Sequence, residues 1–296
     1  MLPVDQVREM LANLIGSPDT PYMHRRAQSA AFAKAFVVPL GLRIATDELG
    51  GVAVEWVIPD GSELAPVLFH LHGGGYVLGD PADSRALTTA FALKAGVRVV
   101  SVDYRLAPEY PFPAAVDDAV AAFQALLGRG YSAKDIAIGG ESAGGGLAIA
   151  TLLAAHDLKL ATPSSVFAIS PWTDLNCFAS SFDTLAHIDP LLTRRALKEM
   201  GDAYLAGADP RSPLASPLFG DLGSLPPLLV HVGSDEVLLD DACELHARAI
   251  AAGVTSRLEI WPKMIHVWHM FHPMLPEGDR AIDALVAFTK LHWGKR

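Results

Sequence analysis

The chain has 296 residues, of which 51% are hydrophobic, and a formal net charge of −10 at pH 7. This length and composition suit one large domain with an insertion and a sizeable buried core. The acidic balance favours solubility and excludes nucleic acid as an expected partner, because phosphate binding needs clustered Lys and Arg side chains.

The cysteines and the N-terminus bear on the compartment and on cofactors. Cys177 and Cys243 fit neither a metal-ligand spacing nor a disulfide framework, so we expect a reducing environment and no metal site. Asp5 and Glu9 interrupt any secretory signal, and no apolar run approaches the ~20 residues of a membrane-spanning helix. We therefore expect a cytoplasmic protein without a membrane span.

The first residues of the chain show the periodicity of a helix. Apolar residues recur at helical spacing from Val4 to Ile15, which predicts an amphipathic helix over residues 3–15. A second apolar segment, Ala30–Val38, ends at Pro39 and Gly41. Both precede the first clear strand, so we interpret them as an N-terminal accessory layer.

From residue 42 to residue 296, strands and helices alternate. Short, almost uniformly apolar strands between helices predict an α/β fold with an eight-stranded, mostly parallel sheet covered on both faces. Residues 42–58 leave no room for a helix, so their two strands should form an antiparallel hairpin at one edge. The expected strands are Leu42–Thr46, Val52–Ile58, Val67–Leu71, Val97–Val102, Ile136–Ile138, Val166–Ile169, Leu228–Val232 and Arg257–Ile260. The expected helices are Ser84–Ala95, Ala114–Leu127, Ala143–His156, Asp240–Ala252 and Asp279–His292.

One stretch breaks this alternation. Between the strands that end near Ser170 and begin near Leu228, the chain is rich in Pro, Ser and Asp, with one helical segment around 192–204. This stretch is too long for a plain connection. We expect this stretch to be an insertion that folds over the sheet together with the N-terminal helices.

The strongest chemical signal is Gly140-Glu141-Ser142-Ala143-Gly144. It matches G-x-S-x-G between an expected strand and an expected helix, the setting in which a tight turn exposes a nucleophilic serine. A structural serine in a glycine turn is the alternative, but the flanking elements favour Ser142 as a catalytic nucleophile.

A second signal, His72-Gly73-Gly74-Gly75-Tyr76, follows the strand Val67–Leu71. Acyl transfer needs backbone N–H groups that face the developing oxyanion, and we expect these from Gly73, Gly74 and Ala143. The loop could instead be a simple glycine-rich turn or a phosphate loop, but no nucleotide-binding pattern accompanies it.

A serine nucleophile needs a base and an orienting acid, in the chain order Ser, acid, His for this architecture. Asp235 follows the strand Leu228–Val232 and is the expected acid, with Glu236, Asp240 and Asp241 as rivals; the last two better suit a helix start. His266 follows the last strand and is the expected base, with His269 and His272 nearby.

Taken together, these motifs resemble those of the hormone-sensitive-lipase-like family of α/β-hydrolases, particularly its bacterial esterases, and the resemblance covers nearly the whole chain. It rests on His72-Gly73-Gly74-Gly75, Tyr104-Arg105-Leu106-Ala107-Pro108-Glu109, Gly140-Glu141-Ser142-Ala143-Gly144-Gly145, Gly233-Ser234-Asp235 and the His266 segment. The resemblance implies an α/β-hydrolase fold with the triad Ser142, Asp235 and His266. It also implies a helical cap made from the N-terminal helices, residues 1–41, and the insertion at residues 173–225.

The resemblance also implies an activity. We expect hydrolysis of short-chain carboxylic esters through an acyl-enzyme, without cofactors, in a homodimer paired through the strand Arg257–Ile260. A lactone hydrolase would use the same residues. A non-catalytic binding protein, as the plant gibberellin receptor is, would lack the base, which is present here as His266.

Three details complete the expectations. The family usually has Asp or Thr before the nucleophile, so Glu141 departs from its pattern, and no role is carried over to it. Arg105, Glu109 and Asp103 are expected to form a buried ion-pair cluster behind the oxyanion loop. The expected substrate-binding residues, which could equally be the insertion's own core, are Tyr76, Phe178, Phe182, Leu185 and Ile188.

Overall fold

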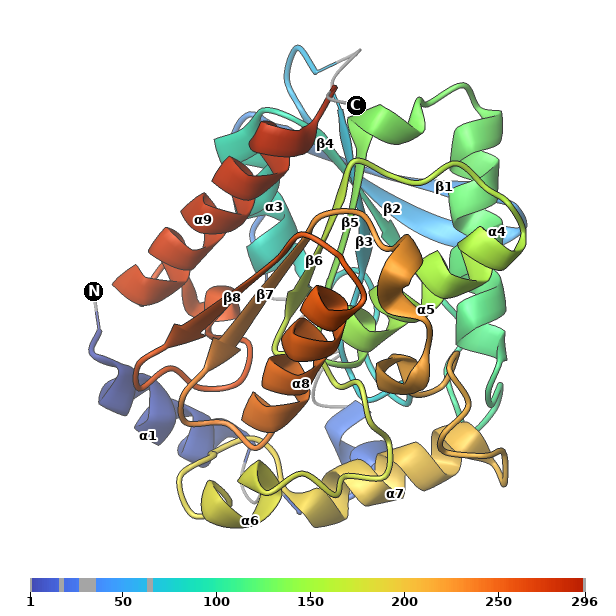
Figure 1. Cartoon of the computed structure of the whole chain (residues 1–296). Coiled ribbons are helices and arrows are strands. Elements are labelled where there is room, and N and C mark those ends of the chain that lie inside the picture. Colours follow the sequence, from blue (N-terminus) through green and yellow to red (C-terminus); the bar gives the residue numbers. More distant parts are fainter. Residues whose placement is uncertain (1, 16–18, 27–35, 63–65, 295–296) are drawn as a thin grey trace.

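The computed structural model describes residues 2–15, 19–26, 36–62 and 66–294. Within this part of the chain, eight strands form one sheet in the order β1-β2-β4-β3-β5-β6-β7-β8 (Figure 1). The strands β1 and β2 form an antiparallel hairpin at one edge, β2 also pairs antiparallel with β4, and all other pairs are parallel. The strand bounds are β1 Leu42–Leu49, β2 Val52–Pro59, β3 Val67–Leu71, β4 Arg98–Val102, β5 Ile136–Glu141, β6 Ser165–Ile169, β7 Leu228–Gly233 and β8 Ser256–Trp261.

Helices cover both faces of this sheet because its central strands are apolar on both sides. On β3, Leu68 belongs to the core under α3 and α9, and the next residue, Phe69, belongs to the larger core under α4, α5 and α8. This alternation follows from the period of two in a strand. The helix bounds are α1 Val4–Ile15, α3 Arg85–Ala95, α4 Ala114–Gly128, α5 Ala143–Asp157, α6 Ser181–Thr184, α7 Arg194–Leu205, α8 Leu239–Ala251 and α9 Pro276–His292.

The fold class expected from the sequence is confirmed. The expected strands and helices are present with ends shifted by a few residues, and the hairpin lies at the sheet edge. The helix expected over residues 3–15 is present as α1. The second apolar segment, Ala30–Val38, lies mostly outside the described residues.

The helices α1, α6 and α7 gather at one end of the sheet (Figure 1). Residues of the N-terminal segment contact both the insertion and the catalytic loops in this region. Thr193 at the start of α7 donates to Asp19 at 2.6 Å, and Arg26 donates to the carbonyl oxygens of Val77 and Ala107. The division into cap helices 1–41, a catalytic domain and an insertion at 173–225 stays a prediction, and these contacts agree with it.

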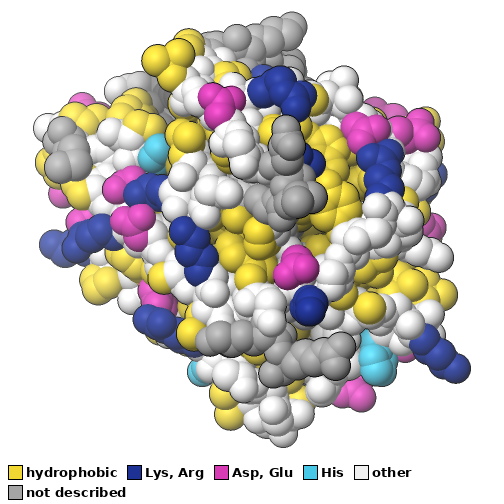
Figure 2. Space-filling view, turned by 90° about the horizontal axis from the view of Figure 1, so that it is seen from above, with side chains coloured by type: hydrophobic (Ala, Val, Ile, Leu, Met, Phe, Trp, Pro, Cys, Tyr) yellow, Lys and Arg dark blue, Asp and Glu magenta, His cyan; other side chains and the backbone are white. Residues whose placement is uncertain are grey.

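The charged side chains of the described residues are mixed on the face that Figure 2 shows. Figure 2 shows Lys and Arg side chains interspersed with Asp and Glu on one face, so the charges there are spread rather than gathered by sign. No described helix is both long and apolar enough to cross a bilayer.

Asp241 ties the start of the insertion to the helix α8. As expected for a helix start, Asp240 and Asp241 lie in the first turn of α8. The carboxylate of Asp241 accepts the backbone N–H groups of Thr173 and Asp174, at 2.9 and 3.0 Å. Burial nevertheless raises the pKa of Asp241 to about 7, because desolvation outweighs these hydrogen bonds.

This raised pKa predicts a pH-dependent stability. A carboxyl whose pKa is higher in the folded state stabilises it fully below about pH 4 and loses that contribution as the pH rises to about 7. Asp241→Asn should therefore remove a fall of roughly 2–4 kcal/mol in the free energy of unfolding over this range. Urea unfolding at pH 4 to 8 measures it, with Asp240→Asn as the matched control. Parallel curves for Asp241→Asn and the wild type would contradict the prediction.

Candidate active site

Ser142 lies at the junction between β5 and α5 in a backbone conformation that side chains rarely adopt, with φ +56° and ψ −124°. The residues two positions before and after Ser142 must be glycines. A Cβ on Gly140 would lie 2.3 Å from the carbonyl oxygen of Gly144, and one on Gly144 would lie 2.1 Å from that of Leu71. The strained turn leaves Ser142 at the wall of a cavity and at the N-terminus of α5, where backbone N–H groups are free for an anion.

The glycine loop after β3 runs beside this turn. The N–H of Gly73 donates to Oε1 of Glu141 at 2.8 Å, so Gly73 is not an open donor as the sequence suggested. The N–H groups of Gly74, Gly75 and Ala143 have no hydrogen-bond partner among the described residues, and both glycines line the cavity with Ser142. Gly75 therefore replaces Gly73 in the set of open donors at this site.

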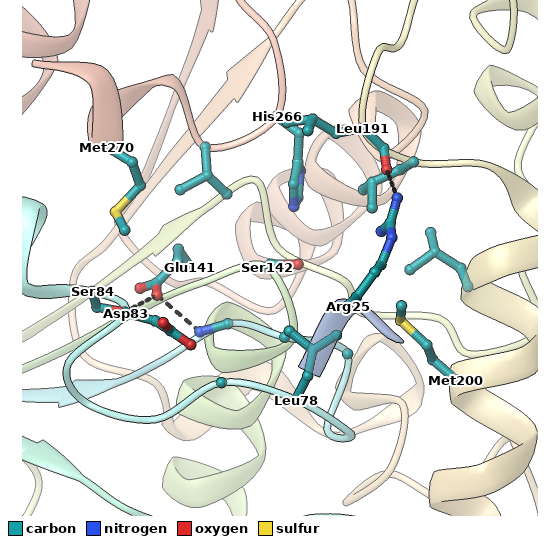
Figure 3. A pocket seen from close by; sticks show the side chains of 17 residues that line it. Arg25, Leu78, Asp83, Ser84, Glu141, Ser142, Leu191, Met200, His266 and Met270 are labelled. Carbon is teal, nitrogen blue, oxygen red and sulfur yellow. Dashed lines mark hydrogen bonds between the residues drawn. The ribbon is translucent and has the colours of Figure 1, made fainter. Parts of the chain in front are cut away.

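His266 follows β8, as expected, and its ring lies at the same cavity (Figure 3). Its Nδ1 lies 2.8 Å from Oε2 of Glu236, whose side chain is completely buried. The other carboxylate oxygen of Glu236 accepts the hydroxyl of Ser170 at 2.8 Å and the N–H of Gly233 at 2.6 Å. A buried carboxylate with these partners can hold an imidazole in one orientation and stabilise its protonated form.

Asp235, the acid expected from the sequence, does not contact His266. Its carboxylate accepts Nη2 of Arg8 at 2.7 Å and the hydroxyl of Ser234 at 2.7 Å, and its side chain is partly exposed. The expected contact between Asp235 and His266 is wrong because the two adjacent acids point in different directions. Asp235 binds Arg8, and Glu236 binds His266. No motif marked Glu236 over Asp235, although it was one of the rivals.

A second buried carboxylate supports the Glu236 turn from the insertion. Asp189 accepts the N–H of Val237 at 2.8 Å and those of Leu191 and Leu192 at 2.8 and 3.0 Å. Burial raises the pKa of Asp189, against the favourable charge of His266. The insertion is thereby attached to the residue that follows Glu236. No motif in the sequence marked Asp189 for this role.

The cavity above Ser142 has a volume of about 240 Å³. This size suits a small ligand, and its wall is mostly apolar. In Figure 3, Met200, Leu191 and Arg25 lie on one side of Ser142, and Met270, Ser84 and Glu141 on the other. The insertion contributes Leu191, Leu192, Leu197 and Met200 to this wall.

The substrate-binding residues expected from the sequence are not those that line this cavity. Tyr76 is 1% exposed and stacks on Tyr204 of α7, with ring centroids 3.9 Å apart. Phe182 is buried beneath Arg194, whereas Phe178 is 82% exposed. Leu185 and Ile188 are partly buried and also lie away from the cavity wall. Apolar spacing in the insertion did not separate the side chains of the cavity from those of its own core.

The other histidines near His266 have structural surroundings. His269 is fully buried against Trp268 and lies 3.0 Å from the His231 ring, and burial holds its pKa well below the ordinary range. His272 is partly buried near Asp279. Neither residue lines the cavity.

The expected ion-pair cluster behind the oxyanion loop has different partners. Arg105 pairs with Asp118 of α4 at 2.7 Å, and Glu109 pairs with Arg26 at 2.7 Å. Asp103 and Glu109 are exposed rather than buried. The expected cluster is wrong because Arg105 binds the helix that follows it and Glu109 binds the N-terminal segment, instead of each other.

Among the described residues, no group of three or more His, Cys, Asp or Glu side chains is placed to hold a metal ion. Both cysteines are free thiols; Cys177 is buried and Cys243 is partly buried.

Comparison with known proteins identifies the family. Residues 68–270 match the model of the alpha/beta hydrolase fold. The chain is an α/β-hydrolase.

Individual relatives indicate the activity class of the α/β-hydrolases to which the chain is similar. It is 47% identical over 247 residues to an acetyl-hydrolase of Streptomyces hygroscopicus, covering 83% of this chain and 82% of the relative. It is 38% identical to an esterase of Acinetobacter venetianus, covering 75% and 74%. A crystal structure of an esterase from the bacterial hormone-sensitive lipase family matches with a TM-score of 0.95 and 40% identity, over 99% of this chain and 100% of that one. The resemblance noted in the sequence is confirmed, and the enzyme class is that of carboxylesterases.

Proposed function

We propose that this hydrolase cleaves short-chain carboxylic esters through an acyl-enzyme on Ser142, with His266 as base and Glu236 as acid. The observation that carries the proposal is the buried pair of His266 and Glu236 at the cavity that Ser142 lines. The assignment of Glu236 replaces Asp235, whose carboxylate is engaged by Arg8.

The proposed reaction follows from these positions. The Nε2 of His266 takes the proton of the Ser142 hydroxyl as Oγ attacks the ester carbonyl, and Glu236 holds the Nδ1–H and stabilises the imidazolium. The N–H groups of Gly74, Gly75 and Ala143 stabilise the oxyanion. The tetrahedral intermediate then collapses and expels the alcohol, which takes the proton from His266. In the second step His266 accepts a proton from water, which attacks the acyl-enzyme and releases the carboxylic acid.

Two observations support a small acyl ester as substrate. The cavity of about 240 Å³ limits the size of the ligand, and Met200, Leu192 and Leu197 give it an apolar wall. Among the relatives, one is named an acetyl-hydrolase, and a structure of EstE5, at 43% identity and a TM-score of 0.93, was soaked with p-nitrophenyl butyrate.

We further propose a homodimer paired through β8. This strand lies at the sheet edge, where its outer backbone groups are open to another strand, and Ile260 on it is 46% exposed. The cytoplasmic location inferred from the sequence stays a prediction.

Replacement of the nucleophile tests the reaction. Ser142→Ala should lower kcat for p-nitrophenyl acetate by about 10³-fold or more, because no acyl-enzyme can form. Mass spectrometry should find a phosphonate inhibitor attached to Ser142 of the wild type and none on the variant. Undiminished hydrolysis by Ser142→Ala would refute the proposal. A panel of acyl lengths and lactone rings separates an esterase from a lactone hydrolase.

The two adjacent acids give a matched pair of variants. Glu236→Gln should lower kcat by about 10³-fold, because the His266 ring loses the charge that orients it and stabilises its protonated form. Asp235→Asn should change kcat by less than about threefold and unfolding by less than about 1 kcal/mol, since it loses only a partly exposed ion pair. Steady-state kinetics and urea unfolding measure both effects. The reverse order of the kinetic losses would restore Asp235 as the acid.

The dimer has its own test. Ile260→Arg should shift the mass in analytical ultracentrifugation from dimer to monomer, because it places a charge at the paired edge. Leu158→Arg is the control, since Leu158 is a similarly exposed apolar residue beyond the end of α5. A monomeric wild type at micromolar concentration would contradict the proposal.

A further inference from the structure

Glu141, the residue before the nucleophile, contacts three other segments through one buried carboxylate. Its Oε1 accepts the N–H of Gly73 at 2.8 Å and the hydroxyl of Ser84 at 2.6 Å. Its Oε2 lies 2.7 Å from Nε2 of His70 on β3. The side chain is 5% exposed, and Figure 3 shows it at the edge of the cavity beside Ser142.

The carboxylate is held in its charged form. Burial pushes the pKa of Glu141 upward, but the His70 ring and the hydrogen bonds from Ser84 and Gly73 outweigh it and lower the pKa below its ordinary value. Hydrogen bonds to an ionised acceptor are shorter and about twice as strong as those between neutral groups. The bond to the Gly73 N–H is therefore a strong one.

This bond acts on the loop that carries the open donors. Gly73 immediately precedes Gly74 and Gly75, whose N–H groups have no partner among the described residues. The next fixed points are the carbonyl oxygen of Gly73, which lies 2.7 Å from Nδ1 of His72, and that of Gly74, which accepts the N–H groups of Val77 and Leu78 at 3.1 and 3.0 Å. The N–H of Gly74 thus lies between Gly73, whose N–H Glu141 accepts, and the fixed carbonyl of Gly74, and the N–H of Gly75 belongs to the same peptide unit as that carbonyl.

The space around Gly73 leaves the loop little freedom to shift. A Cβ on Gly73 would lie 3.1 Å from the carbonyl oxygen of Glu141 and 3.3 Å from Cβ of Ser142. The preceding carbonyl, that of His72, accepts the Tyr104 hydroxyl at 2.7 Å. Donors that stabilise an oxyanion are effective only when they already face its position, so small displacements are costly.

We propose that Glu141 is a positioning residue that holds the Gly73 peptide so that the N–H groups of Gly74 and Gly75 face the oxyanion. This inference rests on the proposed function. Besides His70 on the sheet and Ser84 at the start of α3, which a core-supporting carboxylate would also contact, Glu141 binds the oxyanion loop directly and adjoins the nucleophile.

The test compares Glu141→Ala with Glu55→Ala. Glu55 is also a buried glutamate, paired with Arg85 of α3, but it does not line the cavity. The concentration of active sites is first titrated with a phosphonate that labels Ser142, so that kcat refers to folded enzyme. An aryl trifluoromethyl ketone, which forms an oxyanion on the serine, is then compared with the matching methyl ketone.

Glu141→Ala should lower kcat per titrated site by about 10²-fold with less than about threefold change in KM, because the loss falls on the transition state. Affinity for the trifluoromethyl ketone should fall by a similar factor, and affinity for the methyl ketone should not. Glu55→Ala should lower stability but keep kcat. If Glu141→Ala does not fold, Glu141→Gln should show the same coupled losses at about 10-fold, since it keeps the size but loses the charge.

An unchanged kcat per titrated site in the variant that folds would overturn the inference. So would a fall in kcat without loss of trifluoromethyl ketone affinity, or an equal loss of affinity for both ketones. These outcomes differ from a failure of the proposed function, in which the wild type itself would not be labelled at Ser142.

Discussion

The close backbone contact between the nucleophile turn and the strand β3 is the constraint on which the site depends. The strands β3 and β5 are neighbours in the sheet, so the segments that follow them leave at the same edge. Only glycines at 140 and 144 allow these segments to touch, because a Cβ at either position would lie within 2.6 Å of the Leu71 carbonyl oxygen. This contact brings the glycine loop beside Ser142 and places the Glu141 side chain within reach of Gly73.

The acid–base pair depends on a similar close approach further along the same edge of the sheet, after β7 and β8. A Cβ on Gly233 would lie 2.1 Å from the carbonyl oxygen of Met264, so this glycine lets the turn after β7 pack on the loop that carries His266. Within that narrow space Glu236 is completely buried and finds donors from Ser170, Gly233 and His266. Its neighbour Asp235 lies nearer the surface, where Arg8 of α1 binds it.

The fold could be predicted from the sequence because its signals are local. Apolar strands, helical spacing and glycines at turns specify the sheet and the nucleophile turn, and Ser142 and His266 both line the cavity as expected. Which of Asp235 and Glu236 is the acid that binds His266 could not be predicted. The two residues are adjacent in one turn, and the direction in which each side chain points depends on the packing around that turn. The same holds for Gly73, whose N–H is occupied by a glutamate 68 residues away.

The wall of the cavity was harder still to predict, because it is formed where the insertion packs on the oxyanion loop. Gly75 lies so close to α7 that a Cβ there would be 2.4 Å from Sδ of Met200. Met200 also lines the cavity, so one side chain both bounds the ligand space and limits the position of an open N–H group. Asp189 makes a comparable link from the insertion to the Glu236 turn. The insertion therefore contacts the supports of both the oxyanion loop and the base, and any displacement of α7 and its preceding turn would disturb the catalytic geometry along with the shape of the cavity.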